Sequence, residues 1–64
     1  MNETYINNSN DVPELVERFV ELNFTIRELM AFSASERNSV LKERRWLEKR
    51  INILKPDWRK HYNL

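Results

Sequence analysis

The stretch from residue 11 to residue 30, DVPELVERFVELNFTIRELM, decides the fold. Within it, apolar residues recur at steps of three and four: Val12, Leu15, Phe19, Leu22, Ile26 and Leu29. This spacing places them on one stripe of an α-helix, as at the a and d positions of a coiled coil. Asp11, Pro13 and Glu14 supply an N-cap, a proline in the first turn and a capping-box partner. The pattern predicts a helix over residues 12–32.

The sequence predicts a second helix over residues 34–55. Ser33 and Glu36 form another capping box ahead of it, and Pro56 ends it. One of its core-type positions holds a charged residue, Arg44. The full set is Val40, Arg44, Leu47, Ile51 and Leu54. A charged residue at such a position either fixes the register against a carboxylate of the first helix or extends its side chain to the edge of the helix pair.

These two helices predict an all-α fold, because no strand pattern occurs in the sequence. We expect a coiled-coil-like antiparallel helical hairpin, with a short helix or turn over residues 56–62 that carries Trp58 and Tyr62 on one face. Residues 1–10 are polar and rich in asparagine, which predicts a flexible N-terminal arm unless its two apolar side chains dock on the body. Residues 11–64 then form a single helical domain.

The composition excludes several functional classes. The 64 residues contain no glycine, no cysteine and one histidine. Phosphate-binding loops and nucleophile elbows need glycine, whereas disulfide scaffolds, zinc fingers and thiol nucleophiles need cysteine. His61 has no nucleophile to activate, and the glutamates of the first helix lack the Glu-x-x-His pattern of a two-metal site. We therefore expect a protein that is not an enzyme and that uses no metal or cofactor.

The chain also lacks the patterns of membrane insertion and export. It contains no apolar run near the roughly 20 residues that a membrane span requires. Its first residues show neither the basic region nor the apolar region of a signal peptide. The sequence predicts no membrane span and a cytoplasmic location.

The net charge of +1 conceals a strong segregation of charge. Residues 1–35 sum to −4, and residues 36–64 sum to +5. The simplest interpretation is attraction between the two helices, either across the hairpin or between subunits packed head to tail. A second interpretation is a basic face for nucleic acid, because Lys42, Arg45 and Lys49 share the side of the second helix opposite its apolar stripe.

Both helices carry more apolar surface than one partner helix can cover. The first helix has an additional set beside its stripe, formed by Val16, Val20, Phe24 and Met30. A neighbouring helix covers a stripe about 100° wide, and a chain of this length buries only about 60% of its unfolded surface. We therefore expect this set to mediate self-association into a homo-oligomeric bundle.

The second helix and the C-terminal segment add a set of large side chains: Trp46, Arg50, Ile53, Trp58 and Tyr62. In one interpretation these residues pack on each other, on the N-terminal arm or in an oligomer core. In the other they bind a different protein, because Trp, Tyr and Arg are frequent interface hot spots and exposed apolar patches mark interaction sites.

The leading hypothesis is a non-catalytic helical interaction protein that binds a protein partner through these apolar and aromatic faces. A small nucleic-acid-binding regulator and a structural or assembly subunit of a larger complex are the alternatives. In size and composition the chain resembles small accessory proteins of phages and mobile elements, which commonly inhibit or regulate a host protein.

Overall fold

The structure is a computed structural model that describes residues 1–28 and 33–64. In these ranges the chain forms four helices and no strand: α1 (Glu3–Asn8), α2 (Val12–Glu28), α3 (Ala34–Leu54) and α4 (Trp58–His61). The all-α class is therefore confirmed. The predicted last turn of the first helix falls on residues 29–32, which lie outside the described residues.

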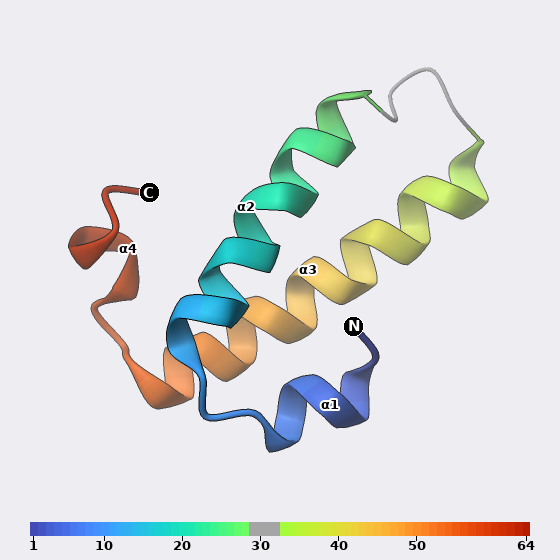
Figure 1. Cartoon of the computed structure of the whole chain (residues 1–64). Coiled ribbons are helices and arrows are strands. Elements are labelled where there is room, and N and C mark those ends of the chain that lie inside the picture. The colour runs from blue at the N-terminus through green and yellow to red at the C-terminus, as the bar shows by residue number, and fades with distance from the viewer. Residues whose placement is uncertain (29–32) are drawn as a thin grey trace.

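Helices α2 and α3 lie side by side and run in opposite directions (Figure 1). Both begin at the caps that the sequence predicts. The Asp11 carboxylate accepts a hydrogen bond from the Glu14 amide at 3.2 Å, and the Ser33 hydroxyl accepts one from the Glu36 amide at 3.4 Å. Each cap satisfies an amide that has no partner within its own helix. Helix α3 ends at Leu54, just ahead of Pro56.

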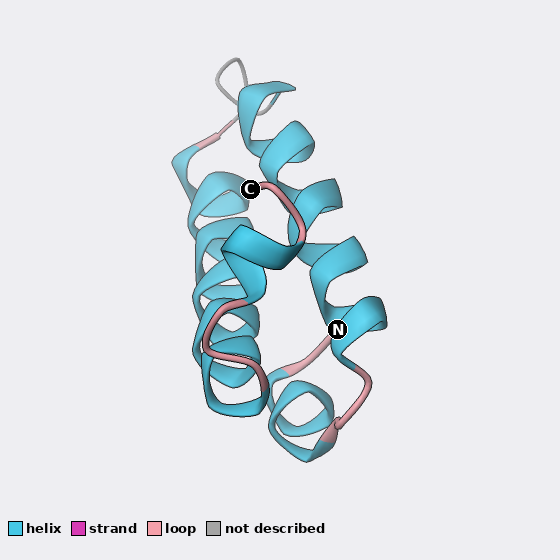
Figure 2. Cartoon of the chain, turned by 90° about the vertical axis from the view of Figure 1, so that its left-hand side faces the viewer, coloured by secondary structure: helices cyan, strands magenta, loops and turns pink. Residues whose placement is uncertain are grey.

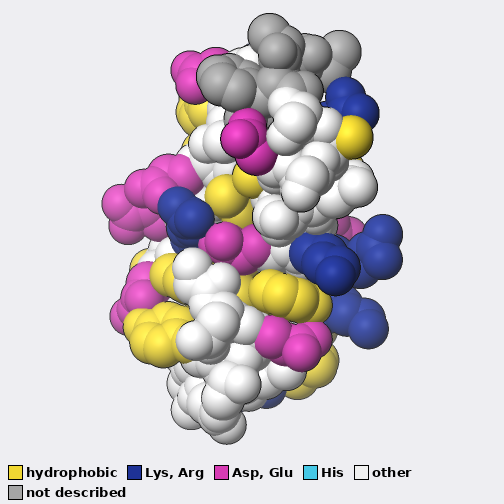
Figure 3. All heavy atoms as spheres, turned by 90° about the vertical axis from the view of Figure 1, so that its right-hand side faces the viewer, with side chains coloured by type: hydrophobic (Ala, Val, Ile, Leu, Met, Phe, Trp, Pro, Cys, Tyr) yellow, Lys and Arg dark blue, Asp and Glu magenta, His cyan; other side chains and the backbone are white. Residues whose placement is uncertain are grey.

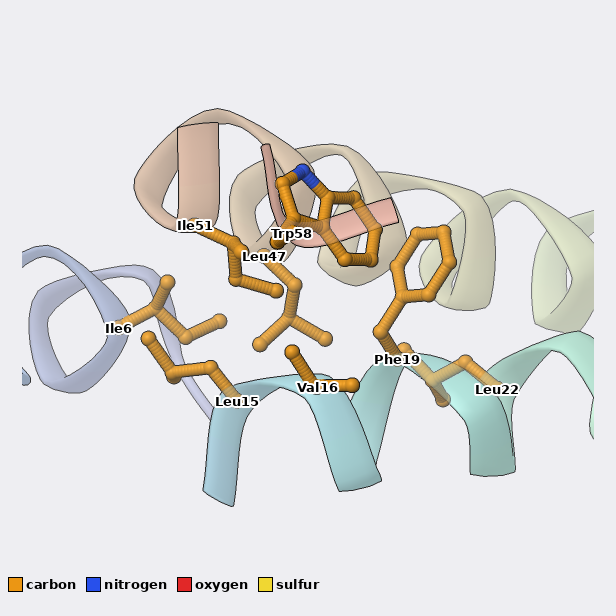
Figure 4. Close-up of a cluster of buried hydrophobic side chains, with 8 residues drawn as sticks. All are labelled: Ile6, Leu15, Val16, Phe19, Leu22, Leu47, Ile51 and Trp58. Carbon is orange, nitrogen blue, oxygen red and sulfur yellow. The ribbon is translucent and has the colours of Figure 1, made fainter. Parts of the chain in front are cut away.

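Helix α1 occupies the segment for which the sequence predicts a flexible arm, and this is a correction. The Asn2 side chain caps α1 by accepting from the Tyr5 amide at 2.8 Å. Ile6 is fully buried beside Leu15 and Ile51 (Figure 4). The cap and the buried side chain fix this segment on the body together with polar contacts, among them the Tyr5 hydroxyl, which donates to the Glu14 carboxylate at 2.6 Å.

Helices α1 and α4 cover the α2/α3 pair from different directions. Helix α1 lies across the end of the pair where α2 begins and α3 ends, and α4 lies against one side of it (Figures 1 and 2). All four helices contribute to one core, which is formed by Ile6, Leu15, Val16, Phe19, Leu22, Leu47, Ile51 and Trp58 (Figure 4).

The core is confined to one part of the helix pair. Residues 23–28 of α2 and 34–46 of α3 contribute no fully buried side chain. We call these two segments the open end. We call residues 12–22 of α2 and 47–54 of α3, together with α1 and α4, the core end.

Candidate interaction surfaces

The side chains that the sequence assigns to a protein partner are divided between core and surface. Trp58 is fully buried, so its assignment to an exposed interface is wrong. Its ring meets the Phe19 ring edge to face, with centroids 5.0 Å apart, and its indole N–H donates to the Asn52 side chain at 2.6 Å. Tyr62 is half-buried and packs against the core. Pro56 and the turn after it fold the chain back so that the indole reaches α2.

The remaining members of this set lie on α3. The Arg50 guanidinium donates to the Ser9 carbonyl at 2.9 Å and to the Asn10 side chain at 3.0 Å. It therefore joins α3 to the link between α1 and α2. Trp46 is half-buried against the core, and Ile53 is 72% exposed. Of the five side chains, Ile53 is the one that stays largely free for a partner.

The set assigned to self-association is divided in the same way. Val16 is a core residue, so its assignment to an oligomer interface is wrong. Val20 is half-buried, and Met30 lies outside the described residues. Phe24 is 61% exposed. It borders a hollow of about 180 Å³ that is lined by Val20, Asn23, Phe24, Arg27 and Leu64.

The presence of Leu64 in this hollow depends on the turn after α4. Asn63 has a φ of +58°, in the left-handed region that asparagine tolerates better than most residues other than glycine. The Leu64 amide then donates to the Arg59 carbonyl at 2.8 Å. The position of Leu64 beside Phe24 could not be predicted from the sequence, because it depends on where α4 docks.

The outer face of α3 carries the predicted basic residues. Lys42, Arg45 and Lys49 are all exposed, and none of them forms an ion pair within residues 1–28 and 33–64. Figure 3, which views the side of the molecule on the right in Figure 1, shows Lys and Arg side chains gathered along one edge. Ile53 continues the same helical face. We call these four residues the basic stripe.

The outer face of α2 carries the opposite charge. Glu17, Glu21, Phe24 and Glu28 are exposed and recur at steps of four, three and four, which places them on one helical face. We call these four residues the acidic stripe. The molecule therefore presents acidic and basic surfaces on two different helices, as the charge segregation predicts.

The contact between α2 and α3 does not use these stripes. In the part of the chain that the structure describes, the ion pair joining the two helices is Arg18 with Glu43, at 2.6 Å and 3.3 Å. Its polarity is the reverse of the predicted attraction, because the acidic helix provides the cation. Burial favours a higher pKa for Glu43, but the hydrogen bonds and charge of Arg18 outweigh it and lower that pKa below its ordinary value of 4.5.

Arg44 lies at a core-type position of α3, and its guanidinium contacts an amide and an aromatic ring of α2. Its guanidinium donates to the Asn23 side chain at 2.7 Å and lies over the Phe19 ring, 4.8 Å from the centroid. Of the two predicted alternatives, the register contact is absent: no carboxylate of α2 meets the guanidinium in the described chain, and the Glu48 carboxylate on α3 itself lies 3.9 Å away. The aromatic face and the amide together accommodate the charge at the edge of the core.

Neither a metal centre nor a membrane span is formed by the described residues. No group of three or more His, Cys, Asp or Glu side chains comes close enough there to hold a metal ion. The described helices are all too short or too polar to cross a membrane.

Comparisons with known proteins identify no relative. No protein-family model matches the sequence, and no curated protein or solved structure is similar enough to count as a match.

Proposed function

We propose that the protein is a non-catalytic helical hairpin that binds another protein through the apolar surface around Phe24. In this role it acts as an inhibitor or regulator that blocks or bridges its partner. The proposal retains the class of function expected from the sequence. It moves the main contact from the Trp58 side of the molecule to the outer face of α2.

The exposure of Phe24 is the observation that carries this proposal. A phenylalanine that is 61% exposed leaves a large apolar surface in water. A chain of this size has a small core, so leaving a large apolar side chain outside that core is costly unless a partner covers it. Val20 and Leu64 extend the apolar surface around the hollow, and Arg27 lies at its border. An aromatic anchor beside a hollow, with an arginine at the border, is typical of interface hot spots.

The test compares two truncations of exposed apolar side chains. The immobilised full chain captures proteins from cells that produce it, and each captured protein is purified and titrated with wild type, Phe24→Ala and Leu41→Ala. We expect Phe24→Ala to weaken binding about 10- to 30-fold, the effect of losing a hot spot. Leu41, which is 40% exposed on α3, is the matched control and should change binding by about twofold or less.

Two results would contradict the proposal. The first is equal affinity of Phe24→Ala and wild type for every purified partner. The second is an equal loss in both variants, which would indicate a nonspecific apolar effect. Circular dichroism of each variant verifies that the helices remain folded.

A further inference from the structure

We propose that the chain binds a second copy of itself head to tail, with the acidic stripe of one copy against the basic stripe of the next. This inference rests on the proposed function, because it assigns an occupant to the surface around Phe24. It concerns the outer faces of α2 and α3, which the contact between these helices within one copy leaves exposed.

The two stripes match in length and in chemistry. Each runs along about 16 Å of helix at roughly 1.5 Å per residue. The acidic stripe has three carboxylates and one apolar side chain, and the basic stripe has three cations and one apolar side chain. Those apolar side chains, Ile53 at 72% and Phe24 at 61%, are the two most exposed large hydrophobic residues in the described chain.

The segregated charges are only partly neutralised within one copy, where Glu21 of the acidic stripe pairs with Arg18 of the same helix at 3.1 Å. The link between α2 and α3 is the reversed pair Arg18–Glu43, and the cations of the basic stripe have no ion-pair partner in the described ranges. Opposite potentials on two surfaces of one molecule favour contact between copies and set its orientation. A second copy is therefore the occupant whose charge complements both stripes.

An antiparallel contact between copies repeats the arrangement of α2 and α3 within each copy. In that register Glu28 faces Lys42 of the next copy, and Glu21 faces its Lys49. Phe24 then faces Arg45, so the guanidinium can lie over the aromatic ring. The spacing of both stripes places these pairs at matching heights to within one residue, and it sets Glu17 opposite Ile53.

The contact is heterologous, because the two stripes are different surfaces. Such a contact leaves one free stripe at each end and continues as a row of copies unless it closes into a ring. Exposed ion pairs are individually weak and are screened by salt, so the association depends on concentration and on ionic strength.

The test measures the mass of the full chain by sedimentation at increasing concentration, in about 0.1 M and about 1 M salt. Across this range the Debye length falls from about 10 Å to about 3 Å. We expect the average mass to rise well above the 7.9 kDa of one chain in low salt and to return towards it in high salt.

Charge reversal then tests the pairing of the stripes. Glu21→Lys/Glu28→Lys reverses the two carboxylates that face Lys49 and Lys42, and Lys42→Glu/Lys49→Glu reverses those two cations, so each variant alone should remain monomeric. An equal mixture should assemble again, because every contact between the two variants is complementary. Glu3→Lys and Lys60→Glu, exposed outside both stripes, are the controls and should assemble like wild type.

Several outcomes would overturn the head-to-tail contact: a wild-type chain that is monomeric throughout, reversed variants that assemble like wild type, or a mixture that stays monomeric. Copurified nucleic acid that is lost only from Lys42→Glu/Lys49→Glu, without any change in mass, would instead assign the basic stripe to nucleic acid. A monomeric chain whose binding to another protein still depends on Phe24 would overturn this contact and leave the proposed function standing.

Discussion

The core end and the open end of the molecule use the same two helices with different results. At the core end, α2 and α3 supply six buried side chains, and α1 and α4 add Ile6 and Trp58. At the open end, the same helices bury no side chain completely, and Val40 and Ile26 are only half-covered. Two antiparallel helices cover one stripe of each other, so a dry core forms only where further elements cover the sides.

The largest expected effect comes from removing Trp58, which closes the core end. Trp58→Ala deletes a fully buried ring that packs against Phe19, and we expect a loss of about 3–5 kcal/mol. That loss is comparable to the whole stability of a domain of this size. Urea denaturation followed by circular dichroism measures it.

Trp46→Ala is the matched control for Trp58→Ala, because Trp46 is only half-buried. We expect it to cost about 1–2 kcal/mol, in the range of ordinary substitutions. Equal losses in the two variants would show that α4 does not close the core.

The second effect tests whether α1 belongs to the core end. Ile6→Ala empties a fully buried site and should lower the free energy of unfolding by about 2–4 kcal/mol. Ile53→Ala removes the same side chain from an exposed site and should change it by about 0.5 kcal/mol or less. If Ile6→Ala were as neutral as Ile53→Ala, residues 1–10 would behave as the flexible arm that the sequence predicts.

The third effect concerns the pair between Arg18 and Glu43 and has a defined pH dependence. The folded-state pKa of Glu43 is lowered, so its contribution to stability is present above the unfolded value near 4.5. That contribution is lost as the pH falls through the folded-state pKa. Glu43→Gln should cost about 1–2 kcal/mol at neutral pH and should flatten the decline in stability below about pH 4.5.

Glu3→Gln, on the exposed face of α1, is the control for Glu43→Gln. It should leave both the free energy of unfolding at neutral pH and the decline of that free energy at acidic pH close to wild type. Denaturant titrations at a series of pH values measure both variants, and an unchanged decline at acidic pH in Glu43→Gln would contradict the assignment.

The smallest effect lies at the open end. Ser33→Ala removes the side-chain cap of α3 and should cost about 0.5–1 kcal/mol. We expect faster amide exchange in the first turn of α3, with little change at the core end. Ser35→Ala, inside the same turn, should not destabilise the helix, because alanine is the better helix former. Faster exchange throughout the molecule would show that the two ends unfold together.

The starts of both long helices and the end of α3 could be predicted because their signals are local. Apolar residues at steps of three and four, caps at Asp11 and Ser33, and Pro56 lie within one or two turns of the ends that they specify. The cap at Asn2 is also local, but the polar composition of the segment outweighed it in the prediction of a flexible arm. A single cap and one buried side chain are weak signals in sequence, and the polar contacts that also hold the segment, such as those of Arg50, form only in the folded molecule.

The surfaces were less predictable because they depend on tertiary contacts. Trp58 reaches Phe19 only when the chain reverses after Pro56, so its burial follows from the docking of α4. The reversed polarity of Arg18 and Glu43 could not follow from summed charges, because side chains at the edge of a helix pair interact individually. The basic stripe follows from helical spacing, whereas the exposure of Phe24 does not, because Val16 of the same predicted set is buried.

The left-handed conformation of Asn63 also bears on the unfolded chain. It is the one described residue with a positive φ, so the remaining described backbone fits residues that carry a β-carbon. A chain of average composition would contain about four or five glycines, and this chain has none. Each glycine replaced where the backbone allows it adds roughly 0.4–1 kcal/mol of stability, because the unfolded ensemble has fewer conformations to lose. The unfolded chain therefore has less conformational entropy to lose on folding. This gain in stability offsets part of the small hydrophobic stabilisation from a core that is confined to one end.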